Sequence, residues 1–239
     1  MTIRNPNELS LDEIEEIEKL TLRWIFQAVL DFGIESYNIF IKSPDSVKDI
    51  AEDITRELLD RLSGYNVPQR IYGTVDYKKA RYVILPNQTI RQALFIDSKA
   101  EKENRSATIQ MSQLSMWVRQ PRANEIMNER GSLPEIYEHE GVFYLTTTCL
   151  IHFKYHDDDN NMHHLEEITV SVIPNGRLQD RYNPTHDDNI WLAGRNAPTL
   201  GEDFRVRLSY HKLKEKSNWR VQKIFFDETN LRCDGQWES

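Results

Sequence analysis

The chain has 239 residues, a formal net charge of −8, 39% apolar residues and 28% charged residues. This length suits one domain or two small ones with a real core, and the composition excludes a largely disordered protein. The acidic excess argues against DNA binding by the surface as a whole, because contacts to phosphate need Lys and Arg. Basic residues nevertheless gather locally, at 78–81, 177–181 and 205–216.

The cysteine content and the hydropathy indicate the cellular setting. Cys149 and Cys233 do not suggest a disulfide framework, so a reducing cytosol is expected. Residues 1–10 are polar, unlike a signal peptide, and apolar runs such as 24–26 are too short to span a bilayer. We therefore expect a cytoplasmic protein with no membrane partner.

Two helices are predicted near the N-terminus. Ser10 and Glu13 form an S-x-x-E capping box, and apolar residues follow at helical spacing, which predicts a helix over residues 10–36. A second amphipathic pattern predicts a helix over residues 46–63, and Gly64 follows it at the position where glycine commonly ends helices.

The pattern then changes to short β-prone segments. Residues 70–76, 81–85 and 93–97 are predicted to be strands separated by polar turns. Apolar residues that could share one helix face predict a helix over residues 106–118. Residues 119–141 show no regular pattern and are predicted to be irregular.

The C-terminal half is predicted to be rich in strands. Residues 142–155 and 167–174 should form a hairpin with a polar tip, and residues 204–210 and 219–226 should be further strands. The polar residues 175–202 between them are predicted to form a long loop, a length that is typical of functional or disordered segments. Helices and strands mix without regular βαβ alternation, so the expected fold class is mixed α/β, that is, α+β.

Three residues suggest a catalytic centre. Asp76 ends one predicted strand, and Asp97 and Lys99 lie two residues apart, so their side chains should point to the same side of a strand. Paired carboxylates can bind a hard divalent cation such as Mg²⁺, and a nearby lysine can position an attacking water for phosphodiester hydrolysis. A single D-x-K also occurs by chance at solvated strand ends, so spacing alone leaves both interpretations open.

Four ordered stretches carry a resemblance to a known family. They are L-S-L-D-E-I-E-x-I-E-K at 9–19, A-E-D-I-T at 51–55, V-D-Y-K-K-A-R at 75–81 with F-I-D-S-K-A-E-K-E-N-R at 95–105, and R-L-Q-D-R-Y-N-P at 177–184 continuing to G-E-D-F-R-V-R-L at 201–208. In these stretches the chain resembles the type II restriction endonucleases of the SfiI/BglI type, which belong to the PD-(D/E)xK nucleases.

The resemblance implies a fold and a set of roles. It implies one restriction-endonuclease-like domain over 1–239, in which a central mixed sheet flanked by helices forms a catalytic core (about 10–120) and a β-rich part (about 140–230) reads DNA. Asp76 and Asp97 match the metal-binding carboxylates and Lys99 matches the catalytic lysine. Glu52 lies where such nucleases often carry a further acid on a helix, although it could equally be a solvated carboxylate.

The same resemblance indicates DNA-contacting residues. Arg205 and Arg207 share one strand face where relatives read bases, and arginine commonly reads guanine; a merely charged strand face is the alternative. Arg195 and Asn196 lie in the preceding loop, where the family pattern is a lysine–histidine pair, so the outer bases are in doubt. The basic residues beside the catalytic strands are candidates for phosphate contacts or for a solvated edge: Lys78, Lys79, Arg81, Lys102 and Arg105.

The function expected from the resemblance is a Mg²⁺-dependent type II restriction endonuclease of a prokaryotic cell, with Mn²⁺ as a possible substitute. Its partner would be double-stranded DNA at an interrupted palindrome containing G·C pairs, cut by a homodimer or homotetramer. No Gly-rich phosphate loop occurs, so no nucleotide cofactor is expected. Two alternatives stay open, a DNA-repair nuclease on the same core and a DNA-binding module with an inactive centre.

Overall fold

The computed structural model describes residues 3–43, 46–62, 69–71, 80–84, 89–102, 106–122, 125–159, 162–192, 205–227, 230–235 and 237. For residues 59–62, 69–71, 80–84 and 122 it describes the backbone only. Within these residues, no helix is both long enough and apolar enough to cross a membrane.

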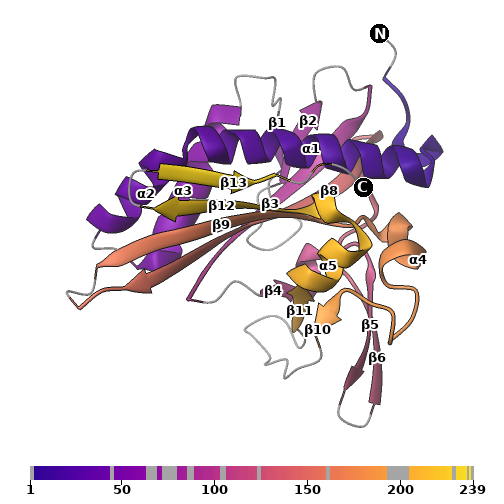
Figure 1. Cartoon of the computed structure of the whole chain (residues 1–239). Helices are drawn as coiled ribbons and strands as arrows, with labels where there is room; N and C mark the ends of the chain where they lie inside the picture. Colours follow the sequence, from indigo (N-terminus) through magenta and orange to yellow (C-terminus); the bar gives the residue numbers. More distant parts are fainter. Residues whose placement is uncertain are drawn as a thin grey trace.

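A mixed sheet runs through the centre of the molecule (Figure 1). Among the described residues it has eight strands, in the order β1-β2-β3-β8-β9-β12-β13 with β7 paired to β8. Their bounds are β1 Gln69–Ile71, β2 Ala80–Ile84, β3 Arg91–Glu101, β7 Ile136–His139, β8 Val142–Asp157, β9 His163–Ile173, β12 Val221–Asp227 and β13 Asn230–Asp234. Strands β3 and β8 run parallel, and the other described neighbours are antiparallel.

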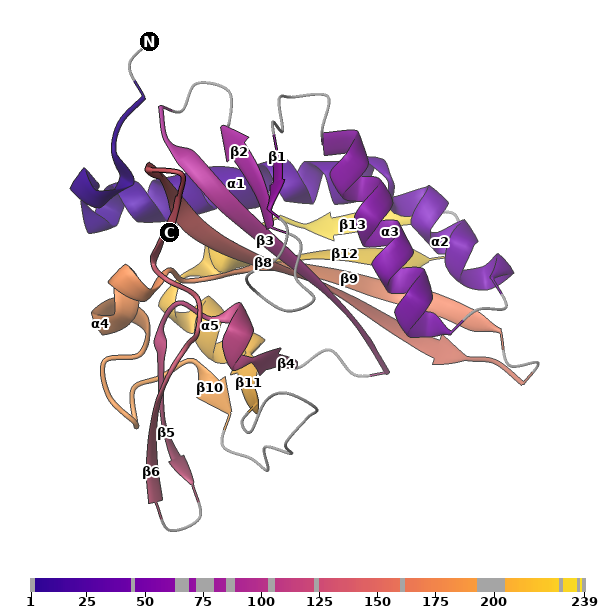
Figure 2. The ribbon, with the colours of Figure 1, turned by 180° about the vertical axis from the view of Figure 1, so that it is seen from behind.

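Three helices cover one face of this sheet. They are α1 (Leu11–Asp31), α2 (Gly33–Lys42) and α3 (Val47–Leu62), and Figure 2 shows α2 and α3 lying across the strands. Their apolar stripes form one buried cluster with the alternate residues of β3, β8 and β9, including Leu94, Ile151 and Val170. Burial of these apolar side chains is the main force that holds the helices on the sheet.

The first helix begins where the sequence predicts, but it ends at Asp31, before the predicted end at residue 36. Ser10 Oγ accepts a hydrogen bond from the Glu13 backbone N–H and the Glu13 carboxylate accepts one from the Ser10 N–H, so the predicted capping box is confirmed. The prediction of one helix over 10–36 is wrong, because the chain turns at Phe32 and restarts as α2. A Cβ on Gly33 would lie 2.9 Å from Leu231 of β13, and the turn lets Ser36 and Phe40 of α2 reach buried positions.

A smaller, mainly β layer covers the other face of the central sheet. It contains the three-stranded sheet β10-β11-β4, built from Trp191–Leu192, Arg205–Ser209 and Ser106–Gln110, and the two-stranded ribbon of β5 (Trp117–Arg122) and β6 (Glu125–Arg130). Figure 1 shows both below the central sheet, with the short helix α5 (Tyr210–Lys216). A second buried cluster joins the layers and includes Ile109, Val206 and Leu150.

The prediction of a helix over residues 106–118 is wrong. The segment forms β4, a 3-10 turn at Met111–Gln113 and the start of β5. Ala107 and Ile109 are buried while Thr108 and Gln110 are partly exposed, so the period here is two, and β4 hydrogen-bonds to β11. Residues 119–141 are not irregular either, since they contain β6, β7 and most of β5.

In the rest of the C-terminal half, some predicted elements are confirmed and others are wrong. The predicted hairpin is confirmed as β8 and β9. The loop prediction for 175–202 is wrong over its described part, which holds a 3-10 turn (Gly176–Leu178), the short helix α4 (Gln179–Tyr182) and β10. Helices and a central mixed sheet confirm the α+β fold class. Because β8, β9 and β12 join the central sheet and β4 joins the smaller one, the two sheets do not follow chain order.

Candidate active site

Asp97 and Lys99 lie side by side near the end of β3. Lys99 Nζ is 2.8 Å from Asp97 Oδ2, and the two side chains are only 22% and 26% exposed. Successive strand residues alternate between faces, so Asp97 and Lys99 share the face turned away from α1, α2 and α3, whereas Leu94 on the other face packs beneath the helices. The predicted carboxylate–ammonium pair is therefore formed on an inner strand of the sheet, where Asp97 pairs with Leu150 and Lys99 with His152 of β8.

A buried histidine lies beside Lys99 on the neighbouring strand. His152 of β8 pairs with Lys99 in the parallel register and is fully buried. Its Nδ1 lies 3.1 Å from Tyr210 Oη, and its Nε2 lies 4.0 Å from Glu101 Oε2. Burial lowers the pKa of His152 to about 4, with smaller contributions from the positive charges of Lys99 and Lys223. The imidazole is thus neutral near pH 7 and adds no second cation beside Lys99.

This histidine makes stability depend on pH. A folded-state pKa of about 4 against an ordinary value of 6.5 means that the unfolded chain binds the proton first as pH falls. The free energy of unfolding should therefore drop between about pH 6.5 and pH 4, by on the order of 3 kcal/mol from this group alone. Urea unfolding at pH 7 and pH 4.5 should show a smaller drop for His152→Gln than for the wild type. Equal drops in the two proteins would assign the pH dependence to other groups.

The residues present fit a divalent metal in part. Asp97 Oδ2 is buried and, despite its contact with Lys99, makes no hydrogen bond of good geometry, so it can still accept a ligand. Carboxylate oxygen is the ligand type that Mg²⁺ prefers, and Mg²⁺ needs only one or two protein carboxylates. Asp76, the predicted second carboxylate, lies outside the described residues. Within the described ranges, no group of three or more His, Cys, Asp or Glu residues is placed to hold a metal.

Glu52 lies on the exposed side of α3. Its Oε1 is 3.7 Å from Lys48 Nζ, one turn earlier on the same helix, and its side chain is 49% exposed. The neighbouring Ala51 and Ile54 turn inward to the sheet. The structure thus pairs Glu52 with its own helix, and its role as a further acid remains a proposal.

The predicted base-reading arginines share one face of β11. Arg207 is exposed and Arg205 half-buried, whereas Val206 and Leu208 between and beside them are fully buried. Arg207 Nη2 donates a 3.0 Å hydrogen bond to Ser106 Oγ of β4. The alternation predicted from the sequence is therefore present, and the arginine side chains lie on the side of the small sheet that faces away from the core.

The other predicted DNA contacts are only partly described. Lys78, Lys79, Arg105, Arg195 and Asn196 lie outside the described residues, and only the backbone of Arg81 is described. Lys102 Nζ is 2.9 Å from Asp157 Oδ2 on the β8–β9 hairpin, and this hydrogen bond raises the pKa of Lys102. A phosphate contact by Lys102 would have to compete with that carboxylate.

Sequence reasoning missed Glu101, His152 and Tyr210. The predicted strand stopped at residue 97, but β3 continues to Glu101, which places a second carboxylate on the same face as Asp97 and Lys99. The alternation D-S-K-A-E at 97–101 was the available signal for Glu101. His152 and Tyr210 become neighbours only through strand pairing and the packing of α5.

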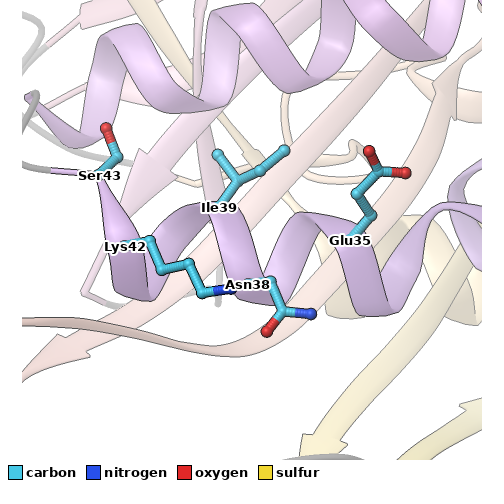
Figure 3. A pocket seen from close by; sticks show the side chains of 5 residues that line it. All are labelled: Glu35, Asn38, Ile39, Lys42 and Ser43. Carbon is cyan, nitrogen blue, oxygen red and sulfur yellow. The ribbon is translucent and has the colours of Figure 1, made fainter.

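A pocket of about 310 Å³ lies elsewhere. It runs along α2 and is lined by Glu35, Asn38, Ile39, Lys42 and Ser43 (Figure 3). None of the predicted site residues contributes to its lining, and it lies on the helical side of the molecule. It is therefore not part of the candidate active site.

Comparisons with known proteins give a consistent assignment. The sequence profile of the family described as "Type II restriction enzyme SfiI" matches residues 31–224. SfiI of Streptomyces fimbriatus is 34% identical over 244 residues, which cover 96% of this chain and 91% of that protein. The crystal structure of tetrameric SfiI bound to cognate DNA has a TM-score of 0.83 at 32% identity, covering 95% of this chain and 90% of that one.

BglI bound to its DNA recognition sequence has a TM-score of 0.71 at 14% identity, over 90% of this chain and 91% of that one, which shows a shared fold. These matches confirm both the resemblance found in the sequence and the restriction-endonuclease-like core. The chain therefore belongs to the SfiI family of type II restriction enzymes, which are site-specific endonucleases.

Proposed function

We propose that this chain is a type II restriction endonuclease that hydrolyses both strands of double-stranded DNA at one interrupted palindromic site, with Mg²⁺ as its cofactor. The observation that carries the proposal is the half-buried contact of Lys99 with Asp97 on one face of β3, in a chain of this family. The related SfiI is described as tetrameric and bound to cognate DNA, which supports DNA as the substrate and a homodimer or homotetramer as the active form.

The proposed mechanism assigns a separate task to each residue. Asp97, with Asp76, would hold the metal, which when bound offsets negative charge on the reacting phosphate and lowers the pKa of water. Lys99 donates hydrogen bonds to the attacking water or to a phosphate oxygen, and Asp97 keeps its ammonium in place. Neutral His152 adds no positive charge beside Lys99, and Glu101 lies two residues beyond Lys99 on β3.

Cleavage should require a divalent metal. Mg²⁺ or Mn²⁺ should support cutting of a plasmid that carries a site, because carboxylates brought together repel each other unless a cation lies between them. Ca²⁺ should support binding with little cutting, since its looser coordination organises the reactants less well. Gel analysis of plasmid incubated with each metal, and with excess EDTA, makes the comparison. Full cutting in EDTA would rule out the metal-dependent centre.

The proposed DNA reading rests on Arg205 and Arg207. Two arginines on one strand face can each donate two hydrogen bonds to guanine O6 and N7, and a symmetric oligomer presents the pair to both half-sites. Arg205→Ala and Arg207→Ala should each lose about 1–3 kcal/mol of discrimination at one base pair. Cleavage rates on duplexes with single base-pair changes measure this. Uniformly weaker cutting of every duplex would instead mean that the arginines contact only phosphate.

Further contacts complete the proposal. Arg195 and Asn196 would read outer bases, and Lys79, Lys102 and Arg105 would contact phosphates, which position the protein without specifying sequence. Glu52 would supply a further acid beside the metal if α3 or its side chain shifts on DNA binding.

A further inference from the structure

The small sheet β10-β11-β4 has two chemically different faces. Ala107 and Ile109 of β4 and Val206 and Leu208 of β11 are fully buried in the cluster that joins this sheet to the central one. The alternate residues point the other way, and they are all polar on both strands: Ser106, Thr108 and Gln110 on β4, and Arg205 and Arg207 on β11.

The register places these polar residues opposite one another. Arg205 pairs with Gln110 and Arg207 pairs with Thr108 in the antiparallel ladder. Directly opposed residues on one face have Cβ atoms about 4.5–5.5 Å apart. A ligand that meets the two guanidinium groups of β11 therefore also lies within reach of the amide of Gln110 and the hydroxyl of Thr108, which are both partly exposed.

Hydrogen bonds made by residues of β4 also fix parts of this polar face of the small sheet. Ser106, which is 5% exposed, accepts a hydrogen bond from Arg207 Nη2, and this fixes the direction of an otherwise flexible side chain. At the other end of β4, the Gln110 backbone N–H donates a 2.8 Å hydrogen bond to Oε1 of the buried Gln113. The first bond fixes the Arg207 side chain and the second fixes the backbone at the end of β4, so this surface loses less entropy when the ligand binds.

The chemistry of the β4 residues suits base edges. An arginine-only face reads guanine, but a glutamine amide has both a donor and an acceptor and can pair with adenine N6 and N7 or with other base edges. Threonine can contact a base through its hydroxyl or place its methyl group against thymine. Acidic side chains, which would repel phosphates, are missing from these five positions of the two strands.

We propose that the DNA-reading surface of this enzyme is the joint polar face of β4 and β11, in which Gln110 and Thr108 are specificity-determining residues beside Arg205 and Arg207, and Ser106 positions Arg207. This inference rests on the proposed function, that is, on sequence-specific DNA cleavage. It adds readers from a strand that follows the catalytic strand β3 directly in the chain, so base recognition and the catalytic residues are joined by one short connection.

The test compares cleavage by variants on the site cut by the wild type and on duplexes carrying each single base-pair change. Gln110→Ala and Thr108→Ala should each lower discrimination about 5- to 150-fold at one base pair per half-site, next to the pair affected by Arg205→Ala or Arg207→Ala. Ser106→Ala should weaken discrimination at the base pair affected by Arg207→Ala, and the double variant should be no worse than Arg207→Ala alone. Gln27→Ala, an exposed glutamine of α1 that donates to Asp31, is the matched control and should leave every ratio unchanged.

Gln110→Glu keeps the shape of the side chain and replaces its donor by acceptors. It should therefore shift the preferred base at its position toward one that presents an amino group, such as cytosine. If Gln110→Ala, Gln110→Glu and Thr108→Ala all keep wild-type ratios at each base pair while Arg205→Ala does not, the inference is wrong and the proposed function stands. If the wild type itself cuts without any preferred site, the proposed function is wrong.

Discussion

Replacing Asp97 or Lys99 by alanine is expected to abolish DNA cleavage while leaving the fold intact, and the Lys99 variant should still bind its DNA site in Ca²⁺. Asp97→Ala removes the carboxylate whose buried Oδ2 can accept a ligand, and Lys99→Ala removes the ammonium held 2.8 Å from it. Loss of a group that moves or positions a proton typically costs about 10²–10⁴-fold in rate. Losing the metal should cost at least as much, and Asp76→Ala should behave like Asp97→Ala.

The measurement is single-turnover cleavage at saturating enzyme, with unfolding followed in parallel. Lys214→Ala is the matched control, because Lys214 also pairs with an aspartate, Asp234, at 3.6 Å but lies on α5 outside the candidate site. It should cut at the wild-type rate. A folded Asp97→Ala or Lys99→Ala variant with near-normal turnover would remove that residue from the catalytic centre.

Replacing Arg220 by methionine is expected to destabilise the protein by about 3–5 kcal/mol, because it leaves a buried carboxylate without its partner. Arg220 Nη2 lies 2.8 Å from Glu18 Oε2, and both side chains are completely buried. The guanidinium also lies over the rings of Tyr182 and Trp219, at 4.3 and 4.4 Å from their centroids. Glu18 Oε1 in turn accepts a hydrogen bond from the Asn175 backbone N–H, so the pair ties α1 to two distant segments.

Burial raises the pKa of Glu18, and the nearby charge of Arg220 opposes that rise. Without Arg220, the carboxyl group should take up a proton or draw in water, and Glu18→Gln combined with Arg220→Met should recover part of the lost stability. Urea unfolding gives the free energies. Arg181→Ala, which breaks solvent-accessible pairs with Asp12 and Glu15, should cost less than about 1 kcal/mol. An equally small loss for Arg220→Met would show that the buried pair contributes little.

Features that depend on neighbouring residues were predictable from the sequence. The capping box of Ser10 and Glu13 and the amphipathic stripe of α3 are set by residues a few positions apart, and the β8–β9 hairpin joins two strand patterns that follow each other in the chain. The same holds for the side-by-side placement of Asp97 and Lys99, which needs only the two-residue period of a strand.

Features that depend on distant partners were not predictable in this way. Residues 106–110 carry apolar side chains that a helix could also use, and they form a strand because β11 lies beside them with almost a hundred residues between. Strand pairing of this kind overrides local propensity. His152 contacts Tyr210, and Arg220 is buried against Glu18. Both pairs join segments far apart in the chain, so no local sequence pattern predicts them.

If this enzyme cuts DNA at one defined site, sequencing the ends left by wild-type digestion of genomic DNA in Mg²⁺ should reveal that site. We expect all ends to derive from a single palindromic motif with G·C pairs in both half-sites, separated by a few unspecified bases. Ends without a common motif, or a motif made of A·T pairs alone, would contradict it.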